Sequence, residues 1–187
     1  MKLQSLFTVA TVVLSLAAGS ALAQDDKAKK QAEVRKAAQD ALARFYKADP
    51  KLKEAVAKSP GYAVFTAIGV SFIFGGAGGK GLAVDNKTKK VAYMDMAQAS
   101  AGLQVGVAES ETLIIFKNAK ALRNFIDKGW EASGGGAVQA GAASKSVGVA
   151  GGEQVISEAS YYTLTKNGLQ AGVAVAGTKF WKDSELN

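Results

Sequence analysis

The sequence contains no cysteine and no histidine, and only two of its 187 residues are proline. Without cysteine the chain forms no disulfide, so an ordinary packed core must hold the fold together. It also lacks a thiolate nucleophile, a histidine base for a serine nucleophile and the usual zinc ligands. These absences predict a protein without a metal site or cofactor, and they leave paired carboxylates as the catalytic groups to consider.

The carboxylates do not form a recognisable acid–base pair. The sixteen Asp and Glu residues are scattered along the chain, whereas glycoside hydrolysis needs two carboxyl groups at a defined separation. Asp95 stands out because it lies between two methionines in an expected strand, but a solvent-facing strand position explains it better. We therefore expect a protein that is not an enzyme, with a carboxylate-based hydrolase as an alternative.

The first 23 residues have the pattern of a secretory signal peptide. Lys2 supplies a positive start, Leu6–Ala18 is an apolar run without a charge, and Ala21-Leu22-Ala23 gives the small side chains that signal peptidase accepts. The apolar run is shorter than the ~20 residues of a membrane-spanning helix. The sequence predicts cleavage after Ala23, a periplasmic location and no transmembrane span in the mature chain.

Positive charge is concentrated near the start of the mature chain. Residues 24–60 hold ten basic and six acidic side chains, a net charge of +4, while residues 61–187 hold twelve and ten, a net charge of +2. A basic excess favours anionic partners. An exported protein meets lipid headgroups more readily than nucleic acid, so we expect lipid surfaces as partners and no nucleic acid.

Residues 24–60 predict an N-terminal helical arm. In residues 27–48 the side chains of Val34, Ala41 and Phe45 fall on one face of a helix and most charged residues fall opposite, which makes the helix amphipathic. Asp49 followed by Pro50 predicts the start of a second short helix that ends near residue 58.

Residues 61–187 predict a glycine-rich β domain. Apolar residues alternate with other residues along several segments, and Asn167-Gly168 predicts a tight hairpin turn. One helix, at residues 118–128, interrupts the strands, with Asn118 as its N-cap and Gly129 at its end.

Small residues on one face of some strands predict how the sheet bends. In 102–108 and 168–176 one face is bulky and the other holds only Gly, Ala or Gln, which allows sharp bending or the close approach of another layer. The predicted fold is therefore α+β: a strongly curved antiparallel β-sheet or small barrel, N-terminal amphipathic helices and one inserted helix.

The run Gly75–Gly81 includes Lys80 but does not predict a nucleotide site. Lys80 is followed by Gly where a Walker loop requires Ser or Thr. The dinucleotide-binding motif must open a helix, but here Leu82-Ala83-Val84 continues as a strand. A glycine-rich bend at a sheet edge fits better, and its N–H groups beside Lys80 could hold a headgroup phosphate.

Several of these segments resemble the SYLF domain, in the same order and at similar spacing. They are Tyr62–Phe65, Gly69–Phe74, Gly75–Val84, Ser100–Gly106, Thr112–Phe116 and Thr165–Gly177. The resemblance covers about residues 34–181 and makes residues 24–187 one SYLF-like domain. The chain lacks the SH3 and FYVE modules of some members, and Val91–Ala99 lacks the proline that is common in the family.

The resemblance implies a lipid-binding domain. Eukaryotic members bind phosphoinositides partly through an N-terminal amphipathic helix, which corresponds to residues 27–47 here, and some bind actin. For an exported protein the resemblance implies binding to anionic lipid in general. The candidate contacts are basic residues of that helix and of the glycine-rich bend: Lys29, Lys30, Arg35, Lys36 and Lys80.

Two interpretations of the apolar residues stay open. The stripe that includes Val34 and Phe45 either enters a membrane interface or packs on the sheet, with the lysines merely solvated. The main alternative function is a periplasmic carrier that encloses a lipid or a small apolar molecule inside the barrel.

The signal peptide gives the first testable prediction. Protein recovered from the periplasm should begin at Gln24, because Ala21 and Ala23 are the well-placed small pair after the apolar run. Intact-mass spectrometry measures this directly. A periplasmic protein whose mass still includes residues 1–23 would contradict the predicted cleavage.

Overall fold

Four long antiparallel strands form the centre of the protein. The computed structural model describes residues 4–71, 74–101, 106–133, 137–139, 155–156, 158–165, 168–171 and 178–187. The helices are α1 (Gln4–Ala48), α2 (Lys51–Lys58) and α3 (Ala119–Lys128). The strands are β1 (Gly61–Ser71), β2 (Phe74–Asp85), β3 (Val91–Ala101), β4 (Gly106–Phe116), β5 (Trp130–Ser133), β6 (Ala137–Gln139), β7 (Val155–Ile156), β8 (Ala159–Thr165), β9 (Gly168–Ala171) and β10 (Thr178–Lys182).

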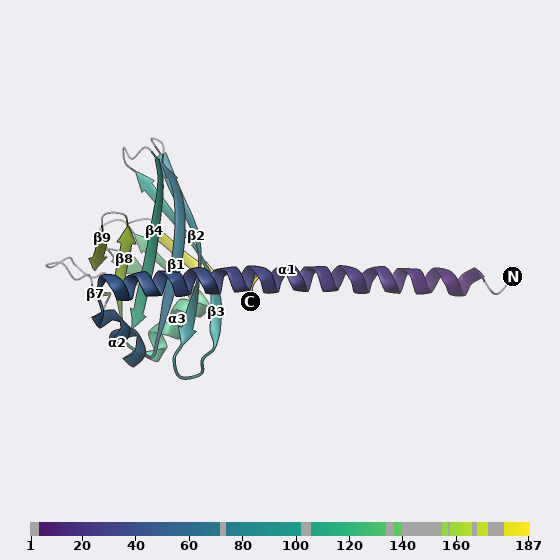
Figure 1. The fold of residues 1–187 in the computed structure, drawn as a ribbon, viewed down its shortest axis with the longest axis horizontal. Coiled ribbons are helices and arrows are strands. Elements are labelled where there is room, and N and C mark those ends of the chain that lie inside the picture. Colours follow the sequence, from purple (N-terminus) through teal and green to yellow (C-terminus); the bar gives the residue numbers. More distant parts are fainter. Residues whose placement is uncertain are drawn as a thin grey trace.

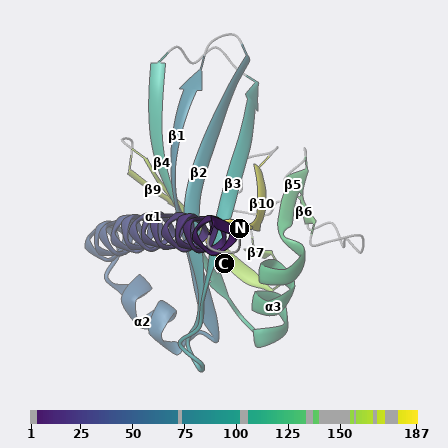
Figure 2. The ribbon, with the colours of Figure 1, turned by 90° about the vertical axis from the view of Figure 1, so that its right-hand side faces the viewer.

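The described strands form one sheet in the order β6-β5-β10-β3-β2-β1-β4-β8-β7, with β9 paired to β8. Neighbouring strands are antiparallel, and the sheet is strongly curled into a half-barrel. Figures 1 and 2 show α1 crossing one face of the sheet, while α3 lies on the other side. The predicted α+β class with a strongly curved antiparallel sheet is confirmed.

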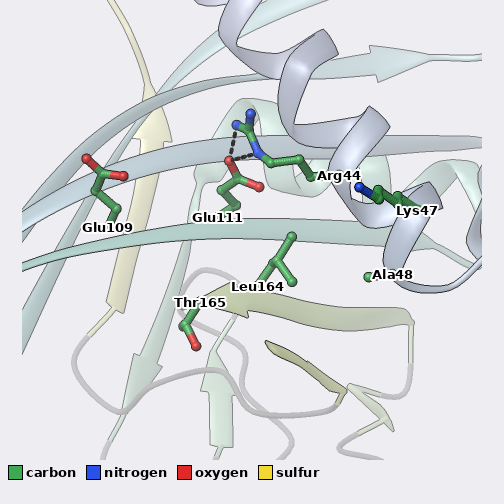
Figure 3. A pocket seen from close by; sticks show the side chains of 7 residues that line it. All are labelled: Arg44, Lys47, Ala48, Glu109, Glu111, Leu164 and Thr165. Carbon is green, nitrogen blue, oxygen red and sulfur yellow. Dashed lines mark hydrogen bonds and ion pairs between the residues drawn. The ribbon is translucent and has the colours of Figure 1, made fainter. Parts of the chain in front are cut away.

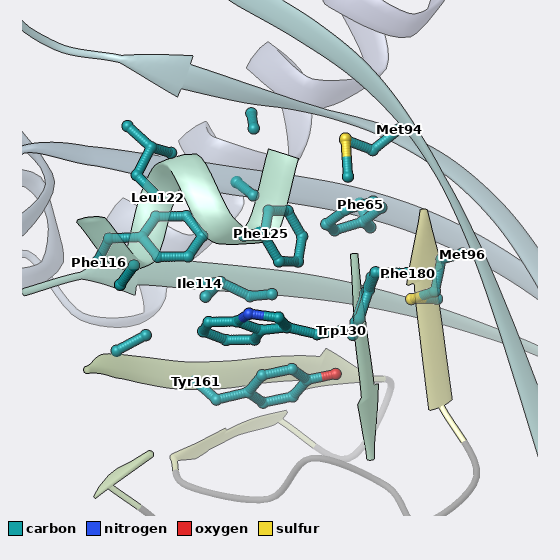
Figure 4. Close-up of a cluster of buried hydrophobic side chains, with 14 of the residues drawn as sticks. Phe65, Met94, Met96, Ile114, Phe116, Leu122, Phe125, Trp130, Tyr161 and Phe180 are labelled. Atoms are coloured by element: carbon teal, nitrogen blue, oxygen red, sulfur yellow. The ribbon is translucent and has the colours of Figure 1, made fainter. Parts of the chain in front are cut away.

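The inner, concave face of the sheet is filled by aromatic side chains. Phe65 and Phe116 from the sheet, Phe125 from α3, Trp130 from β5 and Phe180 from β10 are buried together (Figure 4). Ring centroids lie 4.8 Å apart for Phe65 and Phe180 and 5.1 Å apart for Phe125 and Trp130, within the range in which aromatic pairs attract each other. This cluster occupies the centre of the half-barrel.

The outer face of the sheet is covered by α1 and α2. Alternate residues of the central strands point to this side, as the two-residue period of a strand requires. They pack against the apolar stripe of α1 and two residues of α2. The members of this outer core are Val34, Ala38, Ala41, Phe45, Leu52, Val56, Val64, Leu82, Tyr93, Leu113, Ile115 and Leu186.

The glycine-rich run Gly75–Gly81 lies within a central strand of the sheet, so the predicted bend at a sheet edge is wrong, whereas the predicted strand at Leu82-Ala83-Val84 is present. Strand β2 runs from Phe74 to Asp85 and pairs with β1 and β3 through its glycines. Gly81 has a specific packing role, because a Cβ atom there would lie 2.4 Å from Cδ1 of Phe65. The absence of a side chain at Gly81 therefore lets the Phe65 ring lie against the sheet.

The inserted helix α3 has the predicted ends. The Asn118 side chain accepts a hydrogen bond from the N–H of Ala121 at 2.8 Å, and Gly129 ends the helix with φ +68°. The start of α2 differs by one residue from the prediction. Pro50 is the N-cap, while the Asp49 carboxylate accepts a hydrogen bond from the N–H of Lys51.

Helix α1 ends where predicted but begins earlier. It extends from Gln4 through the segment predicted to be a signal peptide, so cleavage after Ala23 would leave its C-terminal part on the sheet. Among the residues that the structure describes, no helix is long and apolar enough to cross a membrane. Of the segments expected to bend sharply, residues 102–105 and 172–176 lie outside the described residues.

The predicted hairpin near residue 168 is present. Thr165 pairs with Gly168 across the antiparallel strands β8 and β9. Gly168 therefore starts β9 rather than occupying the centre of the turn, and its φ of +106° requires glycine.

Gly168→Val should lower the free energy of unfolding by about 1–3 kcal/mol, because a β-branched residue is strained at positive φ. Thermal unfolding followed by circular dichroism measures the change. Gly78→Val is the matched control, since a Cβ at Gly78 meets nothing within 4 Å and its φ is ordinary. Equal melting temperatures for the two variants would contradict the assigned backbone.

Candidate lipid-binding surface

The apolar stripe of α1 packs on the sheet. Val34 and Ala38 are 8% and 4% exposed, and Ala41 and Phe45 are fully buried. The stripe was expected either to enter a membrane interface or to pack on the sheet, and in the structure it packs on the sheet. Insertion of these side chains into a bilayer would first require α1 to leave the outer core.

The four basic residues that the sequence singles out on α1 are exposed, but three have partners. Lys30 Nζ lies 3.7 Å from the Glu185 carboxylate, and Lys36 Nζ lies 2.7 Å from that of Asp40. The Arg35 guanidinium donates to the Tyr93 hydroxyl at 2.6 Å and lies over its ring. Within the described part of the chain, Lys29 has no such partner.

Lys80 lies on the sheet between two carboxylates and is not grouped with the basic residues of α1. Its Nζ is 2.8 Å from Asp95 and 2.6 Å from Asp183. Partial burial acts to lower the pKa of Lys80, but the hydrogen bonds to Asp183 and Asp95 outweigh it, so the pKa is raised. Lys80 therefore stays charged, and its charge is already neutralised by two acids.

Residues 183–187 form a clasp that joins the sheet to α1. Lys27 Nζ donates to the Asn187 carbonyl and Gln31 Nε2 donates to the Leu186 carbonyl, both at 2.7 Å. The Asn187 side chain donates to the Tyr93 carbonyl at 2.8 Å, while Leu186 is 2% exposed in the outer core. The clasp thus fixes α1 over strand β3.

Asp183 organises the clasp from beneath. It is 2% exposed, and its carboxylate accepts hydrogen bonds from Lys80 and from the N–H groups of Glu185 and Leu186. Burial raises the pKa of Asp183, but the hydrogen bonds from Lys80, Leu186 and Glu185 together hold it below its usual value. This role of Asp183 was not predicted from the sequence. The one local signal for it is that an Asp three residues before Leu186 can accept hydrogen bonds from the backbone N–H groups of a following turn.

Two grooves adjoin α1 on the outer face of the sheet. One, of about 510 Å³, lies between the end of α1 and β8 and is lined by Lys47 and Leu164 (Figure 3). The other, of about 710 Å³, reaches Trp181, which is 39% exposed. They share Glu109 and the ion pair between Arg44 and Glu111, so acidic and basic groups are mixed along this side.

The curled sheet, with helices on its outer face and a filled aromatic interior, can be compared with known families. Residues 97–187 match the model of the Ysc84 family, described as "Las17-binding protein actin regulator". Residues 97–187 belong to the Ysc84 family. This is the SYLF family that the chain's glycine-rich motifs resemble, so that prediction is confirmed.

Relatives of this family member occur in bacteria and yeast. The chain is 30% identical over 155 residues to Beta cell expansion factor A of Aeromonas veronii, covering 80% of this chain and 56% of that protein. It is also 30% identical over 136 residues to Protein YSC84 of Saccharomyces cerevisiae and, separately, to LAS seventeen-binding protein 3 of the same species. These matches cover 70% of this chain and 29% and 30% of the yeast proteins.

The clasp gives a testable prediction about stability. Asp183→Ala should lower the free energy of unfolding by about 1–3 kcal/mol, because buried donors lose their acceptor. Urea unfolding followed by tryptophan fluorescence measures it. The control Glu185→Ala removes a side chain that is 75% exposed and should change stability by less than about 0.5 kcal/mol.

The effect of Asp183→Ala should depend on pH. Because the pKa of Asp183 lies below its usual 3.8, the carboxylate stabilises the fold at pH values above 3.8, and this stabilisation is lost as the pH falls through the folded-state pKa. The stability difference between wild type and variant should therefore shrink below pH 3.8. A difference that grows on acidification would contradict the assigned ionic role.

Proposed function

We propose that this protein binds anionic lipid surfaces peripherally, without inserting a helix. One observation carries the proposal: of the twenty Lys and Arg residues whose side chains are described, nineteen are exposed, whereas the apolar stripe of α1 is buried. The fold therefore offers the bilayer charge rather than apolar surface. The predicted signal peptide would bring the protein to membranes that face the periplasm.

Electrostatic attachment is sufficient for such binding. Each Lys or Arg near an anionic membrane contributes about 1 kcal/mol, and the attraction decays within a Debye length, which is ~10 Å at 0.1 M salt. The exposed amines of Lys29, Lys30 and Lys36 and the guanidinium of Arg35 are contacts on α1. Lys30 and Lys36 must exchange a carboxylate partner for a lipid phosphate. This exchange reduces what each of them contributes to the free energy of binding.

A binding role is also favoured over catalysis. The family description and the names of the relatives refer to binding, regulation and expansion, and none names a reaction. A catalytic general acid needs a raised pKa, whereas the pKa of Asp183 is lowered through its contacts with Lys80 and backbone N–H groups. Asp95 is held by the same lysine.

A carrier of small ligands is the second candidate function, and the outer grooves favour it. The interior of the half-barrel, where a carrier would hold a lipid, is filled by the aromatic cluster around Phe125 and Trp130. The groove beside Leu164 offers about 510 Å³ instead, enough for a small molecule. Such a ligand should copurify at one molecule per chain, as lipid extraction and mass spectrometry would reveal.

Peripheral binding is tested with vesicles. The protein should sediment with vesicles of phosphatidylcholine and phosphatidylglycerol at low salt, be released by high salt, and stay in solution with phosphatidylcholine alone. Charge reversal at Lys29, Lys30, Arg35 and Lys36 should weaken binding by about tenfold or less, because these residues are largely paired in the folded protein. No binding to anionic vesicles, or binding indifferent to salt, would contradict the proposed function.

A further inference from the structure

The excess positive charge of the chain gathers at one end of the sheet. Three segments, 51–58, 85–90 and 117–123, hold nine basic residues and two acidic ones. The chain as a whole has 23 basic and 16 acidic residues, so fourteen of each remain and cancel. The net charge of +7 is therefore the net charge of these three segments.

The fold brings the three segments together around Gly61. Asn86, in the turn between β2 and β3, donates from its side chain to the Val56 carbonyl at the end of α2 at 2.8 Å. A Cβ on Gly61 would lie 2.6 Å from the Leu122 side chain of α3. Arg123 attracts Asp85 electrostatically across the same junction. Figures 1 and 2 show α2, the turn and α3 at the same end of the strands.

We call this end the basic pole. Its nine basic side chains are all exposed, and in the described structure Lys58, bound to Glu54 at 2.6 Å, is the member held in an ion pair. Asp49 and Glu158 lie at its rim and leave the net charge at +5. The basic residues of the pole are Lys51, Lys53, Lys58, Lys87, Lys89, Lys90, Lys117, Lys120 and Arg123.

The opposite end of the central strands carries no charge. Residues 61–79 and 96–108, which include the far halves of β1 to β4, contain no Asp, Glu, Lys or Arg. The described part of the molecule is thus polarised along its central strands, basic at one end and neutral at the other. An anionic surface attracts such a molecule in one orientation, with the pole toward the charge.

We propose that the basic pole is the face that docks on the anionic bilayer, with the central strands pointing away from it. This inference rests on the proposed function and assigns its site. We favour a flat bilayer as the partner because the exposed amines come from three separate segments, α2, the turn and α3, which lie at the same end of the strands (Figure 2). Residues of α1 then add secondary contacts.

Two variants with the same net charge test the location. The pole variant carries Lys53→Glu, Lys87→Glu, Lys90→Glu and Lys120→Glu, and the control is the fourfold reversal on α1. Each basic residue at an anionic surface contributes a factor of about five in affinity, so the pole variant should bind phosphatidylglycerol-containing vesicles at least about 100-fold more weakly than wild type. The affinity of the control for the same vesicles should fall by about tenfold or less. Neutral Lys→Gln changes at the four pole positions should give an intermediate loss without the risk of misfolding.

The outcomes separate the site from the function. Failure of wild type to bind anionic vesicles overturns both proposals. Binding by wild type and pole variant alike, or a larger loss in the α1 variant, overturns only the assigned site. A pole variant that loses binding to duplex DNA but keeps vesicle binding makes the pole a nucleic-acid surface and also overturns the inference.

Orientation is measured independently with fluorophores, because the chain has no cysteine of its own. Single-cysteine variants Thr88→Cys, in the turn of the pole, and Gly78→Cys, on the far part of β2, accept an environment-sensitive dye. Vesicles of phosphatidylglycerol and phosphatidylcholine should change the emission of the first label and leave the second unchanged. The reverse result would place the wrong end on the membrane.

Discussion

The burial of residues 63–65 of strand β1, on both faces of the sheet, is the constraint on which the rest of the structure depends. Phe65 enters the aromatic cluster on the concave side, and its neighbour Val64 enters the outer core beneath α1. A strand segment that is buried on both faces must lie in the interior of the sheet and needs a cover on each side. Helix α3 with β5 and β10 supplies one cover, and α1 with α2 supplies the other. Small residues such as Gly81 then make room for the rings.

This double cover also decides which charges are free to act. The helix that covers the outer face brings its basic side chains close to acids of the clasp and of its own surface, as Lys30 and Lys36 show. Lys80, on the same face of the sheet, is held by two carboxylates. The amines at the ends of the strands have few such neighbours. Packing therefore directs electrostatic recognition away from the amphipathic helix and toward the end of the sheet.

Local patterns in the sequence carried most of the fold. The caps of α3 and the hairpin before Gly168 each depend on neighbouring residues, and the structure has both, whereas the glycine run is a central strand and not the predicted bend at a sheet edge. The burial of Val34 and Phe45 could not be deduced, because an apolar stripe looks the same whether it meets a sheet or a membrane. The basic pole could not be predicted for a related reason. Counting charge along the chain assigned the excess positive charge to residues 24–60. The turn at 85–90 is distant from α2 in the sequence and lies beside it only in the folded protein.

The clasp has a consequence for the order of folding. Its hydrogen bonds to α1 join residues 155 and 160 positions apart in the sequence, so they cannot form until all of the residues between them have been made or translocated. Closing so long a loop costs conformational entropy before the contacts that compensate for this cost have formed. The sheet and α3 can assemble while Leu186 is still absent, but α1 gains its full attachment only afterwards. Helix α1, which is made before the sheet, is thus fully attached only after the sheet has formed. Its apolar stripe remains less protected until the clasp has formed.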